Sequence, residues 1–179
     1  MKISKKVFMA SLAVITITTS VIADEQIPLK GNTFGAITWS PNTKDGTIEG
    51  YNLKGSGMIG IYGGKKDYIS DKFGLYGSFD ASYNKVDDTQ SSDVMYSYRI
   101  FNVGATYTPM KDLTLMGGVG YSMENAEFMY YGENYRSIED NDQINFNVEA
   151  MYNITDDIGL IAGYNTAPEA FNVGVSFSF

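Results

Sequence analysis

The sequence predicts an all-β fold, an eight-stranded antiparallel up-and-down barrel that spans a membrane, and three observations support this prediction. Residues 171–179 alternate strictly between apolar side chains and small or polar ones. Alternation with a period of two predicts a strand with one apolar and one polar face. The tripeptide Phe-Asn-Val occurs three times, starting at Phe101, Phe146 and Phe171, which indicates a repeated structural unit. The third observation is an amino-terminal segment typical of exported proteins.

This amino-terminal segment has the pattern of a secretory signal peptide. Lys2, Lys5 and Lys6 precede an uncharged run over residues 7–22, and Ala23 closes a cleavage site with short side chains. The run is short for a membrane-spanning helix. We therefore expect residues 1–23 to be removed and residues 24–179 to form one barrel domain. No cysteine is present, so the sequence excludes a lipoprotein anchor and disulfide bonds.

The charge balance narrows the possible partners. The 179 residues include 13 basic and 21 acidic ones, for a formal net charge of −8. Loss of the signal peptide removes three lysines and no acid, so the mature charge becomes −11. A nucleic-acid-binding protein needs a basic face, so we expect no nucleic acid partner. No later apolar run is long enough for a membrane helix, but barrel strands escape that test because half of each strand is polar.

Alternating segments separated by turn residues predict eight strands. They cover residues 32–40, 51–63, 73–83, 96–107, 113–123, 144–152, 158–164 and 171–179. Residues 63–67, 108–112 and 153–157 are predicted turns, whereas residues 84–93 and 124–142 are predicted loops. Barrels of the outer membrane have short turns in the periplasm and longer loops outside, which puts both chain ends on the turn side.

The alternation also assigns a facing to each side chain. Val103 and Val148 should face lipid, and the facing of the first strand stays open. The lumen positions are Asp80, Asn102, Met116, Asn145, Asn147, Glu149 and Met151. Arg99 would face lipid near the outer rim if alternation holds. A bulge would instead turn Arg99 inward, where it could pair with Glu149 or Asp80.

Aromatic residues fall where two membrane girdles would lie. Tyr107, Tyr152 and Phe179 fall at one rim, and the other rim holds Trp39, Tyr83, Tyr121 and Tyr164. The alternative is a soluble lipocalin-like barrel, whose apolar side chains point inward. The signal peptide, the terminal aromatic strand and the girdles favour the membrane.

Several stretches resemble a known family. They are residues 73–79, 102–107, 117–121 and 171–179. They look like the eight-stranded outer-membrane protein X and attachment–invasion barrels of Gram-negative bacteria, over roughly residues 30–179. The resemblance implies an assembly signal read by the barrel assembly machinery, carried here by Phe171, Val173, Val175, Phe177 and Phe179. It also implies roles in adhesion, serum resistance or envelope integrity, and outer-membrane lipids and lipopolysaccharide as partners.

The residue inventory argues against catalysis. The chain has no histidine and no cysteine, the residues on which nucleophilic catalysis and zinc sites usually depend. Paired carboxylates such as Asp156 and Asp157 are typical of turns. Acids in the long loop lack the spacing of a Ca²⁺ site. We expect no enzyme activity, no cofactor and no metal site.

Two functions stay open at this stage. The first is a monomeric structural or surface-interaction barrel, with host-cell or matrix proteins as candidate partners. Its recognition segment would be residues 124–142, since Tyr and Arg are enriched at interfaces. The candidate residues are Phe128, Tyr130, Tyr131, Tyr135 and Arg136. The second is a narrow, porin-like channel for small or apolar solutes, resembling the outer-membrane protein W group.

Overall fold

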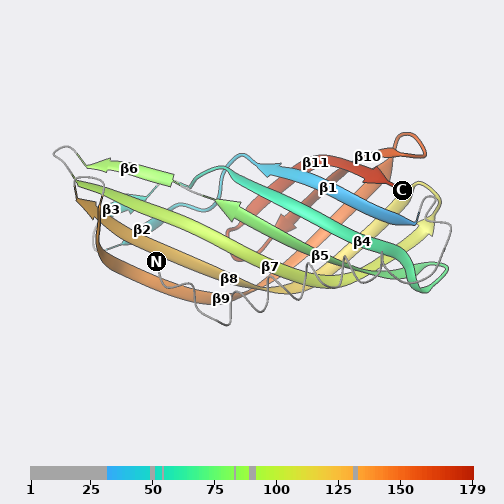
Figure 1. Ribbon diagram of the computed structural model, residues 1–179, viewed down its shortest axis with the longest axis horizontal. Helices are drawn as coiled ribbons and strands as arrows, with labels where there is room; N and C mark the ends of the chain where they lie inside the picture. The colour runs from blue at the N-terminus through green and yellow to red at the C-terminus, as the bar shows by residue number, and fades with distance from the viewer. Residues whose placement is uncertain (1–31, 49–50, 54, 83, 89–91, 131–132) are drawn as a thin grey trace.

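A computed structural model of the chain describes residues 32–179, except for 49–50, 54, 83, 89–91 and 131–132 (Figure 1). The predicted signal peptide lies outside the described residues. Within them the regular structure consists of strands, and no helix there is long and apolar enough to span a membrane.

Eight strands form the wall of the barrel. They are β1 (Thr33–Ser40), β4 (Met58–Ser70), β5 (Phe73–Ser82), β7 (Ser92–Met110), β8 (Leu113–Tyr130), β9 (Glu133–Asn153), β10 (Ile158–Asn165) and β11 (Ala170–Ser178). The short β6 (Asn84–Asp88) pairs with β7 beyond the end of β5. A separate small hairpin consists of β2 (Gly46–Ile48) and β3 (Tyr51–Leu53).

The wall is closed. The hydrogen-bonded order runs β5-β4-β1-β11-β10-β9-β8-β7, and β5 also pairs with β7. All neighbours are antiparallel, including the seam between β1 and β11, whose register runs from Phe34 opposite Ser178 to Trp39 opposite Val173. The predicted eight-stranded up-and-down barrel is therefore confirmed.

The apolar side chains point outward. Val148 is 62% exposed while its neighbour Asn147 is 2% exposed, and the same contrast separates Val103 from Asn102. The residues predicted to carry an assembly signal lie on the outer face of β11 and just after it: Phe171, Val173, Val175, Phe177 and Phe179. A continuous apolar outer surface suits a lipid environment, so the barrel is of the transmembrane type and the lipocalin-like alternative is wrong.

The two open questions of facing are also settled. In β1, Ile37 and Trp39 are exposed, whereas Phe34 is buried in the lumen. Alternation continues without a bulge through Arg99, which is exposed on the outside between two buried residues. Of the predicted girdle residues, Trp39, Tyr107, Tyr121, Tyr152 and Phe179 are exposed and Tyr164 is half-buried, while Tyr83 lies outside the described residues.

Backbone hydrogen bonds connect the short turns, the first described residues and the carboxyl-terminal residues along one rim. They run from Phe179 N to Thr33 O, Ser178 N to Asp157 O, Asn153 N to Asp112 O, Thr108 N to Lys72 O and Lys66 N to Asn32 O. This rim is the turn side predicted from the sequence.

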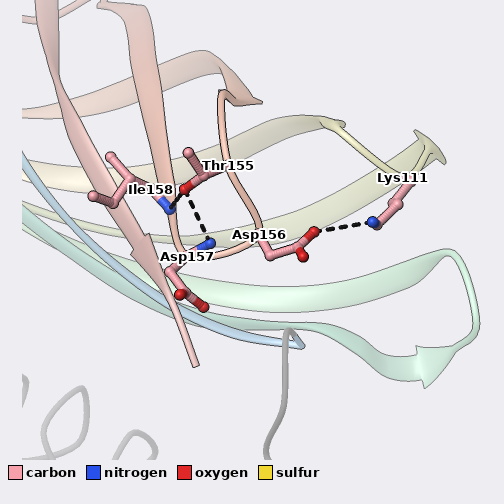
Figure 2. Close-up of polar contacts among 5 residues, drawn as sticks. All are labelled: Lys111, Thr155, Asp156, Asp157 and Ile158. Carbon is pink, nitrogen blue, oxygen red and sulfur yellow. Dashed lines mark hydrogen bonds and ion pairs between the residues drawn. The ribbon is translucent and has the colours of Figure 1, made fainter.

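The turn between β9 and β10 shows how this rim is built (Figure 2). The Thr155 hydroxyl oxygen accepts hydrogen bonds from the backbone N–H groups of Asp157 and Ile158, at 3.3 and 3.0 Å. Lys111 Nζ donates to Asp156 Oδ1 at 3.0 Å from the neighbouring turn, and this hydrogen bond raises the pKa of Lys111. Because both side chains are largely exposed, water screens the ion pair, which therefore contributes little stability.

Three predicted turns or loops are wrong. Residues 63–67 do not form a turn, because β4 continues to Ser70 and buries Lys66, whose Nζ donates to Ser178 Oγ at 3.0 Å. Residues 84–93 and 124–142 are largely strand, as extensions of β6–β7 and β8–β9. Their alternation is weak because a sheet outside the membrane can carry polar residues on both faces.

Candidate functional site: the projecting sheet and the filled lumen

The predicted recognition segment is a long hairpin. Pairing of β8 with β9 continues from Glu124 opposite Asn141 to Tyr130 opposite Glu133, with two register shifts. Phe128, Tyr130, Tyr135 and Arg136 lie on these two strands, but their side chains are outside those described. Tyr131 lies outside the described residues altogether. Whether these aromatic residues form one cluster stays a prediction.

The hairpin projects from the end of the barrel opposite the chain's carboxyl terminus, at the left of Figure 1. β9 has 21 residues, whereas a membrane strand needs about 9–11. Its neighbour β10 has only 8 residues and pairs with β9 no farther than Asn147. The projecting sheet therefore consists of β6 and the outer portions of β7, β8 and β9, and the separate β2–β3 hairpin lies at the same end of the barrel (Figure 1).

One side of the projecting β9 is an open edge. Beyond Asn147, the backbone of Phe146 still makes two hydrogen bonds with Thr166. The Thr166 N–H donates to Phe146 O, and the Thr166 side-chain Oγ1 accepts from Phe146 N. Farther out, residues 133–145 have β8 on one side and no other described strand on the other. We name residues 133–145 the free edge.

The free edge presents backbone hydrogen-bond donors and acceptors, and its side chains are mostly acidic where they are charged. Unpaired N–H and C=O groups on an edge strand are a template for pairing with another strand. The free edge contains four acids and one base, namely Glu133, Glu139, Asp140, Asp142 and Arg136. A strand that adds here would therefore meet a negative field.

The second feature of interest is a hydrogen-bonded cluster in the lumen. The hydroxyl oxygen of Tyr62, from β4, lies 3.3 Å from Asp80 Oδ1 and 3.0 Å from Glu149 Oε1. Asn172, from β11, donates from Nδ2 to Glu149 Oε1 at 3.1 Å and to the Tyr62 hydroxyl at 3.3 Å. We name Tyr62, Asp80, Glu149 and Asn172 the carboxylate cluster. It connects β4, β5, β9 and β11 across the barrel.

Neutral side chains extend this network toward the projecting end. Asn102 Nδ2 donates to Ser78 Oγ at 3.0 Å and to Asp80 Oδ2 at 3.4 Å. Asn145 Nδ2 in turn donates to Asn102 Oδ1 at 2.8 Å and to Asn165 Oδ1 at 2.7 Å. The lumen is therefore filled by packed polar side chains, as expected for a barrel of this width.

Two glycines make room for the carboxylates. A Cβ at Gly60 would lie 2.2 Å from Asp80 Oδ1 and 2.5 Å from Thr38 Oγ1. A Cβ at Gly163 would lie 1.7 Å from Glu149 Oε2. Gly60 pairs with Asp80, and Gly163 pairs with Glu149, so each carboxylate folds over the glycine of its neighbouring strand.

The cluster brings two acidic side chains together in the interior of the barrel. Asp80 is fully buried and Glu149 is 4% exposed. The inward-facing base among the described residues, Lys66, lies four residues from Tyr62 along β4, about 13 Å away, and its Nζ bonds to Ser178. Because both carboxylates lie within hydrogen-bond distance of the same Tyr62 hydroxyl, two ionised groups there would repel each other strongly.

The lumen facing predicted from the sequence is confirmed. Asp80, Asn102, Asn145, Asn147 and Glu149 are all buried inside the barrel, together with Met116 and Met151. Tyr62 is not among the predicted lumen residues, although strict alternation with the outward Ile61 places it inward. Lys66 is not among them either, because a Gly-Gly-Lys-Lys run is more typical of a turn than of a strand.

Comparison with solved structures identifies the same fold elsewhere. The attachment invasion locus protein Ail of Yersinia pestis, in complex with the heparin analogue sucrose octasulfate, matches with a TM-score of 0.68 at 15% identity, over 83% of this chain and 99% of that chain. Ail in a phospholipid bilayer nanodisc matches with a TM-score of 0.53 at 13% identity, over 82% and 99%. Neisserial surface protein A matches with a TM-score of 0.51 at 13% identity, over 83% and 97%.

The sequence comparisons find no match. No family model matches the chain, and no curated protein matches it. At these identities the structural likeness establishes the fold, which is that of eight-stranded barrels of the bacterial outer membrane.

Proposed function

We propose that this protein is a non-catalytic barrel of the bacterial outer membrane whose role is surface interaction through its projecting sheet. The observation that carries the proposal is the free edge of β9, which continues well past the last residue paired with β10. A rigid barrel that holds a long open strand away from the membrane is suited to binding another chain.

The mode of binding would be strand addition. An extended segment of a partner protein would pair with the free edge through main-chain hydrogen bonds. The acids along the edge favour a partner segment with basic side chains. The same charge disfavours polyanions, so binding of a heparin-like polymer, as in the Ail complex, is not part of the proposal for this chain.

The filled lumen favours surface interaction over the channel alternative. Side chains from β4, β5, β9 and β11 meet at the carboxylate cluster, and Asn102, Asn145 and Asn165 form a second linked layer. Passage of a solute would require these hydrogen bonds to break together. We therefore place the function on the projecting sheet.

The backbone geometry of β9 supplies a sharp test. Phe146 directs both its N–H and its C=O toward the β10 side. Because successive residues of a strand alternate, Asp142 directs its N–H to the free edge, whereas Asn141 directs its N–H toward β8. Asp142→Pro should remove a free-edge donor without breaking the β8 ladder, since proline is tolerated on edge strands. Asp142→Ala removes the same carboxylate, which contacts the Tyr121 hydroxyl, and keeps the donor.

Binding would be measured with barrels in lipid nanodiscs against cultured epithelial cells and a panel of immobilised matrix proteins. Wild type and Asp142→Ala should bind, and Asp142→Pro should fold but bind weakly. Replacement of residues 126–137 by a short Gly-Ser linker should abolish binding and leave the barrel intact. Equal binding by the folded Asp142→Pro and Asp142→Ala proteins would refute strand addition, and binding that survives the linker would refute this site.

A further inference from the structure

We propose that the carboxylate cluster binds one hard divalent cation of the Ca²⁺ type inside the barrel. The inference does not depend on the proposed surface function, because it concerns the lumen. It starts from the two buried carboxylates, Asp80 and Glu149, which approach the same tyrosine hydroxyl.

The first argument is a count of donors. Tyr62 has one hydroxyl proton and two carboxylate neighbours, so it can donate to only one of them. Its oxygen already receives a hydrogen bond from Asn172 Nδ2. If Tyr62 donates to Glu149 at 3.0 Å, Asp80 Oδ1 faces a lone pair at 3.3 Å. The cluster therefore lacks one proton or cation, and a cation that contacts both carboxylates beside the Tyr62 hydroxyl would supply it.

The second argument is a set of unpartnered oxygens. Among the described residues, Thr38 Oγ1, Glu149 Oε2 and Asn172 Oδ1 are buried without a hydrogen-bond partner. The hydroxyl of Thr38, itself 1% exposed, lies over Gly60 beside Asp80 Oδ1. Buried polar atoms normally have partners. These three oxygens belong to the carboxylate cluster or lie beside it, so they are available as ligands for a cation.

The ligand set favours Ca²⁺ over other metals. The oxygens available are all hard ligands. They come from the carboxylates of Asp80 and Glu149, the hydroxyl of Thr38, the amide of Asn172 and the phenol of Tyr62. The chain has no histidine or cysteine to bind a softer metal. Ca²⁺ accepts six to eight oxygens in irregular geometry, whereas Mg²⁺ requires near-octahedral geometry and keeps several waters. The described residues contain no group of three or more carboxylates or other typical metal ligands, so the neutral oxygens are essential to the site.

Binding would be measured on the full barrel, folded in lipid nanodiscs and stripped with a chelator, by equilibrium dialysis with radioactive Ca²⁺. We expect one Ca²⁺ per barrel and a higher thermal midpoint in Ca²⁺ than in chelator. Asp80→Asn and Glu149→Gln keep the side-chain shape and should lose stoichiometric binding. Thr38→Val keeps the charge and should bind with lower affinity. Asp156→Asn, in an exposed turn, is the matched control and should bind as wild type does.

Folding of each variant would be checked by the mobility of unboiled protein on a gel. If both carboxylate variants fail to fold, the number of Ca²⁺ ions bound per wild-type barrel tests the proposal. The proposal is wrong if wild type binds no Ca²⁺ at millimolar concentration. It is also wrong if Asp80→Asn, Glu149→Gln and Thr38→Val all bind as wild type does. A thermal midpoint that responds to pH and to no metal cation would show that a proton occupies the cluster instead.

Discussion

Gly163 in the lumen and the lipid-facing Gly117 allow a matched test of the packing inside the barrel. Gly163→Ala would place its Cβ 1.7 Å from Glu149 Oε2 and 2.5 Å from the backbone oxygen of Val148. The carboxylate can swing away only by leaving Tyr62 and Asn172, and the backbone oxygen can move only if β9 and β10 separate. Overpacking of this kind typically costs about 1–3 kcal/mol.

Gly117→Ala is the control, because a Cβ at Gly117 meets nothing within 4 Å. Gly117 lies on the outer face of β8, where an added methyl group faces lipid. The substitution should stabilise by about 0.4–1 kcal/mol, since alanine reduces the conformational freedom of the unfolded chain. The two variants should therefore move the unfolding midpoint in opposite directions.

The assay is reversible urea unfolding of the barrel in lipid vesicles, followed by far-ultraviolet circular dichroism. The slope of the transition should stay constant, so the shift in midpoint reports stability. Equal midpoints for Gly163→Ala and Gly117→Ala would refute the close contact of Glu149 with Gly163. A destabilising Gly117→Ala would refute the outward facing of that residue.

Two further predictions concern the outer surface. Val148→Arg should destabilise the barrel by about 2–4 kcal/mol because Val148 faces lipid. Asn147→Asp should cost less stability, because it keeps the oxygen that accepts from the Tyr76 hydroxyl at 3.0 Å. Comparable urea midpoints for the two variants would contradict the assigned facing. Phe179→Ala should slow insertion of the barrel in cells and change the unfolding midpoint little, since Phe179 is exposed at the rim and its backbone N–H still bonds to Thr33 O. The assembly rate would be measured by pulse labelling and the gel-mobility shift. Assembly at the wild-type rate would exclude Phe179 as part of an assembly signal.

The barrel wall could be predicted from the sequence because a membrane imposes a strict pattern on it. Lipid on one side and a packed lumen on the other force alternation, so Val148 and Asn147 reveal their facing directly. The projecting sheet has water on its outer face, and this pattern weakens there, so residues 124–142 resembled a loop. The carboxylate cluster could not be assembled from sequence, because Asp80 and Glu149 meet only when strands from opposite sides of the barrel close around Tyr62.

The seam between β1 and β11 has a consequence for biogenesis. Phe34 pairs with Ser178 across this seam. The first strand of the barrel can therefore form its hydrogen bonds on this side only after the last strand has been made. Until then β1 and β11 each present an open edge, and both carry apolar side chains that favour aggregation. Contacts between residues so distant in sequence form slowly, because a long loop must close first. The chain therefore remains prone to aggregation until the pairing of β1 with β11 removes both open edges.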